Sequence, residues 1–144
     1  MSWEKIDPAT DPLELLSLGV RLHGHRGPFL ALGIRMGLLA LRLLSSSGFT
    51  GIAAEAHTGT EPPISCLVDG IQVATGCTAG KGNLQVLPGG RPEALFTANG
   101  QTLRVALQEE WLKRLLASGA KETLTDEVLT TPEEELFTWS LSSS

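Results

Sequence analysis

The sequence predicts an α+β fold in a single domain that spans residues 1–144. Apolar residues recur at helical spacing in the first third of the chain and again near the C-terminus, whereas the middle holds short apolar runs separated by glycine-rich turns. Helices grouped at the ends and strands grouped between them are typical of α+β domains. We therefore expect N-terminal helices packed on a mixed or antiparallel sheet.

Two helices are predicted first. Asp11 is a suitable N-cap and Pro12 a suitable first residue for a helix that ends at the His-Gly-His turn of residues 23–25. A second helix begins at Pro28 and ends before the serine-rich stretch that closes at Gly48.

The second predicted helix is apolar around most of its circumference. Arg35 and Arg42 share one stripe, which we expect to reach water while the rest is buried. Gly33 and Gly37 leave a flat patch that a second helix or a second subunit can approach closely. The apolar stretch 28–44 is shorter than the roughly 20 residues that a bilayer requires and carries both arginines, so no membrane span is expected.

The middle of the chain is predicted to form one strand, then a loop and one short helix. Residues 49–57 indicate a strand and residues 58–63 a loop. A short helix then begins at Ile64 or Ser65, and Gly76 ends it as a left-handed cap.

Three further runs predict strands, at residues 83–87, 93–98 and 102–107. Gly89-Gly90 separates the first two, and Asn99-Gly100, a strong hairpin signal, separates the last two. We expect these strands to form an antiparallel meander.

Helices are predicted again over the C-terminal residues 108–141. Residues 108–117 have an amphipathic pattern, and Thr131-Pro132 followed by three glutamates is typical of a capped helix start.

Composition excludes several classes of function. The formal net charge of −5 and a pI near 5.1 give no basic surface for nucleic acid. The N-terminus lacks the basic start and apolar run of a signal peptide, so we expect a cytoplasmic protein. Two cysteines do not make a disulfide scaffold.

The residues that could bind a metal or take part in catalysis concentrate in two places. The segment 66–83 holds both cysteines, Asp69 and Lys81, and His23 and His25 lie upstream. Together they supply the imidazole, thiolate and carboxylate ligands that transition metals bind. Gly24 allows both imidazoles to turn toward one ligand.

Cys66 and Asp69 lie three residues apart and therefore share one face of the predicted helix. A nearby carboxylate raises the pKa of a thiol, whereas a bound cation lowers it, so this pair favours a metal over nucleophilic catalysis. Structural interpretations stay open: Cys66 as a small buried apolar residue, Asp69 as a cap, and His23 as a partner of the helix dipole.

The glycine-rich run 76–83 is not a Walker A motif, because a glycine follows Lys81 and a strand comes next. It predicts either an anion cradle built from Thr78, Gly80 and Lys81 or only a tight connection between helix and strand.

Four separated motifs resemble the FmdE family, named for the E component of molybdenum formylmethanofuran dehydrogenase. They are His23-Gly-His25, Leu32-Gly33-Ile-Arg35-Met-Gly37, Cys66-x-x-Asp69-Gly-Ile-Gln72 and Thr75-Gly76-Cys77-Thr78-x-Gly80-Lys81-Gly82-Asn83. The resemblance covers about residues 11–110 and implies an α+β core, a homodimer, and a cleft that holds a metal such as zinc. The residues it places in that cleft are His23, His25, Cys66, Asp69, Cys77 and Lys81.

The chain departs from this family in two respects. Many relatives have a cysteine where this chain has Gly27, so one expected thiolate is missing. Longer relatives append a cysteine-rich zinc finger, and residues 111–144 contain no cysteine. Nothing in the chain implies a pterin or nucleotide cofactor.

The resulting hypothesis is a small metal- or metallocofactor-binding protein. Its ligands would be His23, His25, Cys66, Asp69 and Cys77, with Lys81 and its loop as the anchor of a small anionic ligand; in an enzyme, His25 or Asp69 would move protons. Two alternatives stay open: a noncatalytic regulatory subunit of a larger oxidoreductase complex, and a thiol redox protein that oxidises Cys66 and Cys77 to a disulfide.

Overall fold

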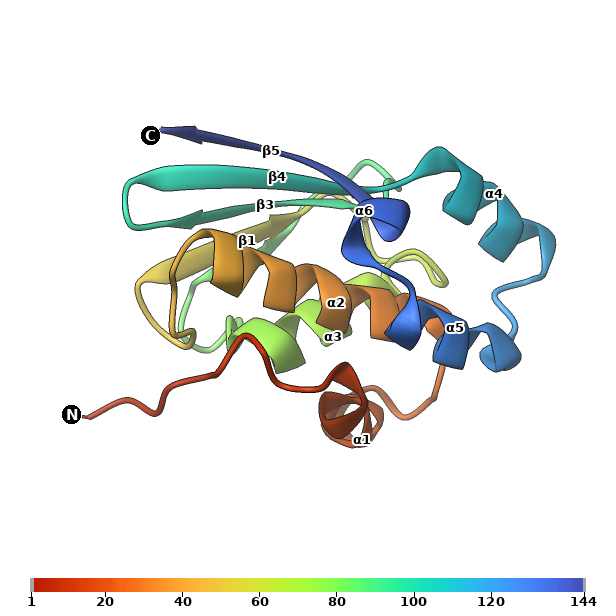
Figure 1. Cartoon of the computed structure of the whole chain (residues 1–144), viewed down its shortest axis with the longest axis horizontal. Helices are drawn as coiled ribbons and strands as arrows, with labels where there is room; N and C mark the ends of the chain where they lie inside the picture. The colour runs from red at the N-terminus through yellow and green to blue at the C-terminus, as the bar shows by residue number, and fades with distance from the viewer. Residues whose placement is uncertain (1, 144) are drawn as a thin grey trace.

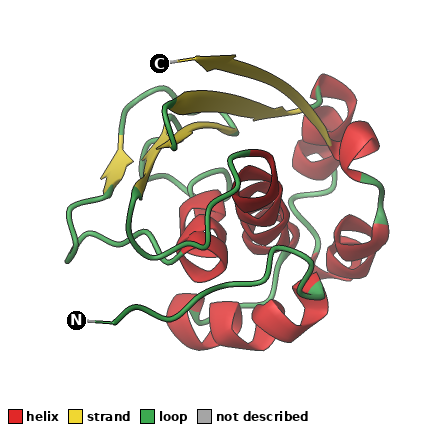
Figure 2. Cartoon of the chain, turned by 60° about the vertical axis from the view of Figure 1, so that its left-hand side comes forward, coloured by secondary structure: helices red, strands yellow, loops and turns green. Residues whose placement is uncertain are grey.

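The computed structural model describes residues 2–143 and confirms the α+β prediction. A five-stranded mixed sheet, in the order β2-β1-β3-β4-β5, lies along one side of the molecule, and helices cover one of its faces (Figures 1 and 2). The helices are α1 (Pro12–His23), α2 (Pro28–Leu43), α3 (Cys66–Thr75), α4 (Glu109–Ala117), the 3-10 helix η1 (Glu122–Leu124), α5 (Thr125–Thr130) and α6 (Glu133–Leu136). The strands are β1 (Ile52–Ala56), β2 (Leu84–Val86), β3 (Glu93–Ala98), β4 (Gln101–Leu107) and β5 (Phe137–Ser143).

α1 begins and ends as predicted. The Asp11 side chain accepts a hydrogen bond from the backbone N–H of Leu13 at 3.0 Å, and Gly24 closes the helix with a φ of 87°. In Figure 1, α1 lies on the side of α2 and α3 that faces away from the sheet. The His-Gly-His turn therefore leads from this outer helix into the central pair.

α2 is buried along almost its whole length, as predicted, and its arginine stripe reaches water only in part, because Arg42 is exposed whereas Arg35 is half-buried. Arg35 donates hydrogen bonds to the carbonyl oxygens of Val128 and Leu129, at 2.8 and 3.0 Å, and Arg42 pairs with Glu133 at 2.7 Å. These partners belong to α5 and α6, more than 90 residues later in the chain. Among residues 2–143, no helix has the length and apolarity to cross a lipid bilayer.

The flat patch predicted on α2 receives α3 of the same chain. A Cβ atom added at Gly33 would lie 2.0 Å from the carbonyl oxygen of Leu67, and one at Gly37 would lie 2.6 Å from Cβ of Ala74. On the facing helix, a Cβ at Gly70 would lie 2.8 Å from Cα of Gly33. The two helices therefore contact backbone to backbone and run parallel, so they begin at the same end of the molecule.

The predicted meander is wrong in one strand. β3 and β4 form the expected hairpin, with Asn99 and Gly100 both at positive φ. β2 instead pairs in parallel with β1, with Leu84 opposite Ala54. Parallel neighbours need a long crossover connection, and the segment that contains α3 supplies it.

The C-terminal helix prediction is wrong for residues 137–143, which form the edge strand β5. Its apolar residues alternate with serine and threonine, and Trp139 pairs in register with Val105 of β4. Thr131 does not cap the last helix, because its hydroxyl donates to the carbonyl oxygen of Glu127 at 2.7 Å. The alternation of period two, read from the sequence, was the missed signal.

Candidate functional site

The candidate site lies where the two central helices begin. Cys66 is the first residue of α3, and the His-Gly-His turn directly precedes α2. Because α2 and α3 start at the same end, these segments meet around a cavity of about 40 Å³. Its lining residues are His23, His25, Gly27, Pro28, Phe29, Leu30, Pro63, Cys66 and Ala120. The predicted convergence of the two histidines with Cys66 is thus present in the fold.

His23 is held by Asp69 of α3. Its Nδ1 lies 2.6 Å from Oδ2 of Asp69, and the two side chains are 16% and 34% exposed. An ionised carboxylate accepts hydrogen bonds only, so Nδ1 carries a proton, and in the neutral imidazole Nε2 is then the nitrogen with the free lone pair. A carboxylate that fixes the tautomer in this way is the usual partner of a metal-bound imidazole.

Cys66 lines the same cavity and is half-buried. Burial is the main cause that raises the pKa of its thiol, the negative charge of Asp69 raises it further, and a backbone hydrogen bond partly opposes both. The predicted direction of the Asp69 effect is confirmed. The thiol is therefore protonated at neutral pH and becomes a strong ligand only when a cation displaces its proton.

His25 lies at the mouth of the cavity and is exposed. Its ring lies over Gly27: a Cβ atom at this glycine would lie 3.2 Å from both Cε1 and Nδ1 of His25. A side chain at position 27 would therefore stand directly beside the imidazole. The glycine leaves that space open.

The donor types fit a transition metal, but the described residues do not close a coordination shell. Within residues 2–143, no three His, Cys, Asp or Glu side chains come together in a group that could hold a metal ion. Asp69 already bonds to His23, so the bonded oxygen is not free to complete such a set. His23 and Cys66 are the two donors that face the cavity from fixed helix positions.

The structure does not bring Cys77 to this site. Cys77 follows the other end of α3, has no exposed surface, and lies in the hydrophobic core with its sulfur 3.8 Å from the carbonyl oxygen of Ile52. The length of α3 separates it from Cys66 by roughly 14 Å, at about 1.5 Å per residue. A disulfide needs Cα atoms within about 7 Å, so the two cysteines cannot form one in this fold.

The structure also places Thr78, Gly80 and Lys81 at that far end of α3. The backbone N–H of Thr78 donates to the Asn83 side chain at 2.9 Å, and the Lys81 N–H donates to the Thr78 hydroxyl at 3.3 Å. The Lys81 ammonium donates to the carbonyl oxygen of Gly76 at 2.5 Å and lies 5.9 Å from the ring centre of Trp3. The loop therefore caps α3 with its own groups, as the structural interpretation of this run expected.

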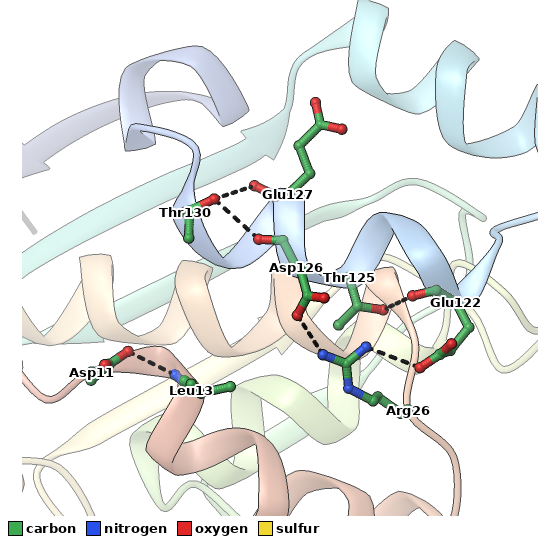
Figure 3. Close-up of polar contacts among 8 residues, drawn as sticks. All are labelled: Asp11, Leu13, Arg26, Glu122, Thr125, Asp126, Glu127 and Thr130. Carbon is green, nitrogen blue, oxygen red and sulfur yellow. Dashed lines mark hydrogen bonds and ion pairs between the residues drawn. The ribbon is translucent and has the colours of Figure 1, made fainter.

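Two residues near the cavity were missed by the sequence analysis. Arg26 donates to Glu122 of η1 at 2.9 Å and to Asp126 of α5 at 2.5 Å (Figure 3). Ala120, in the turn after α4, forms part of the cavity wall. Arg26 could have been found from its position between His25 and Gly27. Ala120 has no sequence signal, because only the tertiary fold brings it to the cavity.

Three findings relate the chain to known proteins. The family model described as "FmdE, Molybdenum formylmethanofuran dehydrogenase operon" matches residues 22–138. The chain is 35% identical over 96 residues to a protein of Archaeoglobus fulgidus described as a probable S-adenosyl-L-methionine-binding protein, an alignment that covers 62% of this chain and 25% of that protein. The chain therefore spans about a quarter of that relative's length.

A solved structure shares the fold. It is a protein of Syntrophus aciditrophicus described as FmdE-like, after the corresponding component of tungsten formylmethanofuran dehydrogenase, with a TM-score of 0.72 and 22% identity over 99% of this chain and 78% of that one. At this identity the likeness concerns the fold alone. The family model, which matches most of the chain, establishes the relationship: this protein belongs to the FmdE family.

Proposed function

We propose that this protein is a small metal-binding member of the FmdE family, with zinc as the preferred ion. The site is the cavity between the His-Gly-His turn and the start of α3. His23 and Cys66 are the proposed ligands, His25 is a third that turns inward from the exposed mouth, and Asp69 orients His23.

The observation that carries this proposal is the bond between His23 Nδ1 and Asp69 Oδ2, beside a thiol that lines the same cavity. It fixes the imidazole with Nε2 available, which is the state that a metal requires. A cation in the cavity would also relieve the cost that burial and Asp69 impose on the Cys66 thiolate.

The start of α2 favours negative charge in the same place. Its N-cap is Gly27, which has no side chain to bond the first turn, and its first residues, Pro28 and Phe29, line the cavity. The positive end of a helix stabilises an adjacent anion by about 0.3–1 kcal/mol. This supports a thiolate at Cys66 and a small anionic ligand on the metal.

The volume of the cavity in this structure is too small for a larger cofactor. About 40 Å³ holds an ion with a few waters, whereas pockets for organic ligands measure about 300–1,000 Å³. S-adenosylmethionine, which the description of the A. fulgidus relative suggests, is too large for this cavity as it stands. For proton transfer, His25 is a better candidate than Asp69, because Asp69 is engaged by His23.

Metal titration tests the proposal. Zinc affinity, measured by competition with a chromogenic chelator on tag-free protein, is expected to fall at least about tenfold in Cys66→Ser and in His23→Gln, and about 10- to 100-fold in Asp69→Asn. His57→Gln, a histidine outside the cavity, is the matched control and should bind as the unchanged protein does. Equal affinity in Cys66→Ser and the unchanged protein would rule out Cys66 as a ligand.

The pH dependence of zinc binding follows from the thiol. Because burial and Asp69 raise the pKa of Cys66, the proton must be displaced at neutral pH, and apparent affinity should rise as pH rises toward that pKa. In Cys66→Ser this part of the pH dependence should disappear. Homodimerisation and a role as a noncatalytic subunit of an oxidoreductase complex remain predictions.

A further inference from the structure

A short segment from the C-terminal half of the chain contributes one residue to the wall of the cavity. Residues 118–124 connect α4 to α5, and Ala120 within them lines the cavity. Both ends of this segment are anchored, because Leu115 and Thr125 have no exposed surface. No residue of η1 is fully buried, and within the segment only Ala120 and Leu124, both partly buried, pack against the hydrophobic core. Segments with few buried contacts open most easily in native proteins.

Arg26 fastens this segment to the rim of the cavity. Its guanidinium bonds to Glu122 of η1 and to Asp126 of α5, while its neighbours His25 and Gly27 both line the cavity (Figure 3). The Arg26 side chain is one-third exposed, and both carboxylates are more exposed still. One side chain therefore connects the wall that holds the candidate ligands to the segment that covers them.

The backbone of the segment adds a conformational cost. Gly119 and Ala120 have φ values of 70° and 54°, and alanine rarely adopts this left-handed region. The N–H of Ala120 bonds to the carbonyl oxygen of Leu115 at 2.7 Å, which ends α4 tightly. The observed conformation of the segment is thus maintained by the partly buried Ala120 and Leu124 and by a few exposed contacts, against a strained turn.

We propose that residues 118–124 form a movable strap over the site and that Arg26 is its latch, so that opening the strap decides which ligands larger than an ion are admitted. The biological role of this gate rests on the proposed function, since it regulates the same site. Its existence does not, because opening exposes the Cys66 thiol whether or not a metal binds. Exposed ion pairs contribute little each, so the latch can release at ambient temperature.

Chemical labelling of the Cys66 thiol tests the gate directly. With iodoacetamide, and with 5,5′-dithiobis(2-nitrobenzoic acid), a bulkier reagent that forms a mixed disulfide, the rate for Cys66 should rise about two- to fivefold in Arg26→Gln, as expected from losing the exposed ion pair to Glu122. The rise should be larger for the bulkier reagent, and Arg26→Lys should restore part of the protection. Arg42→Gln, which removes an exposed ion pair to Glu133 far from the cavity, is the matched control and should not change the rate.

Two internal checks separate opening from other causes. Removing a positive charge cannot make the thiolate of Cys66 more abundant, so a charge effect alone would slow the reaction rather than speed it. Cys77, which is fully buried, reports global unfolding, and its labelling should lag far behind that of Cys66. Added salt should speed labelling in the unchanged protein and not in Arg26→Gln.

Equal Cys66 labelling rates in Arg26→Gln and the unchanged protein, or equal labelling of Cys66 and Cys77, would overturn the strap. If the unchanged protein does not bind zinc in the titration, but Cys66 labelling still depends on Arg26, the metal assignment is overturned and the strap is not. The two proposals therefore fail by different measurements.

Discussion

The two ends of α3 each carry a cysteine and a run of polar residues, yet they are built for different purposes. At the first end, Cys66 is half-buried beside a cavity, and Asp69 reaches across to His23. At the far end, Cys77 is sealed in the core, and Lys81 caps the helix by bonding to Gly76. One end places its polar side chains around a cavity, whereas at the other end Lys81 bonds to the carbonyl oxygen of Gly76.

This difference shows that residue content does not locate a site. Glycines, a lysine and a cysteine gather in residues 76–83 more densely than around Cys66. Their hydrogen-bonding groups are nevertheless used within the loop, with Thr78 bonded to Asn83 and Lys81 to Gly76. A functional site requires donors that remain free to face a ligand, and the first end of α3 gathers His23, His25 and Cys66 around one cavity.

The helix crossing that positions the first end should be the most sensitive feature of the molecule. Gly33→Ala places a Cβ 2.0 Å from the backbone oxygen of Leu67, so α2 and α3 must separate, and we expect a loss of about 3 kcal/mol or more in the free energy of unfolding. Gly37→Ala meets the side-chain methyl of Ala74 at 2.6 Å and should cost about 1–2 kcal/mol. Urea unfolding measures both.

Gly19→Ala provides the control for these two variants. Gly19 also lies within a helix, but its added Cβ would meet only the ends of side chains, those of Leu30 at 3.3 Å and Ile34 at 3.5 Å. The gain in helix propensity, about 1 kcal/mol, should offset that contact. A Gly33→Ala protein as stable as Gly19→Ala would contradict the backbone contact between α2 and α3.

The two cysteines should respond in opposite ways to the same substitution. Cys77→Ser buries a hydroxyl in the core and should lower the free energy of unfolding by about 1–3 kcal/mol without changing zinc affinity. Cys66→Ser should cost less than about 1 kcal/mol and abolish strong zinc binding. Denaturant unfolding and the zinc titration, made on the same preparations, give both readouts, and a reversed order would contradict the assignment of the two ends.

The pH dependence of the free energy of unfolding gives a second test of the burial of Cys77. Burial raises the pKa of the Cys77 thiol, although Thr75 and Lys81 partly oppose the effect. The unfolded chain therefore ionises first, so the stability contributed by the protonated thiol is complete below the ordinary thiol pKa and is lost as pH rises above it. Compared with the unchanged protein, Cys77→Ala should lose less stability between about pH 7 and pH 10.

The smallest effect is expected at Lys81. Lys81→Met removes the bond to the Gly76 carbonyl oxygen and the contact with the Trp3 ring, and should lower the free energy of unfolding by about 0.5–1 kcal/mol. Zinc affinity and Cys66 alkylation should stay unchanged, because Lys81 lies at the far end of α3. A loss of zinc or inorganic phosphate binding in this variant would support the earlier hypothesis that Lys81 anchors a small anionic ligand.

Local sequence signals were sufficient to predict the features that depend only on residues close in sequence. The Asp11 cap, the left-handed Gly24 and Gly76, and the Asn99-Gly100 hairpin were predicted because each depends on backbone preferences within a few residues. The convergence of His23 with α3 was predicted from residue chemistry and family resemblance, and the contact with Asp69 agrees with it.

Two of the predictions that failed depend on distant partners. β2 was expected to join a meander, but its pairing with β1 depends on the crossover through α3. The Arg35 stripe was expected to reach water, but it meets carbonyl groups more than 90 residues away. Neither partner is visible in a local pattern, since hydrogen bonds across the fold leave no periodicity in the sequence.

The sequence by itself determined the boundaries of the first helices, the tight turns and the kinds of ligand atoms this protein offers, because backbone propensity and side-chain chemistry are local properties. The tertiary structure alone decided which of those atoms meet. The glycine contacts between α2 and α3 align the starts of the two helices, which brings His23 to Asp69 and leaves Cys77 at the opposite end. A helix of ten residues is long enough to separate two chemically similar cysteines into a ligand candidate and a core residue.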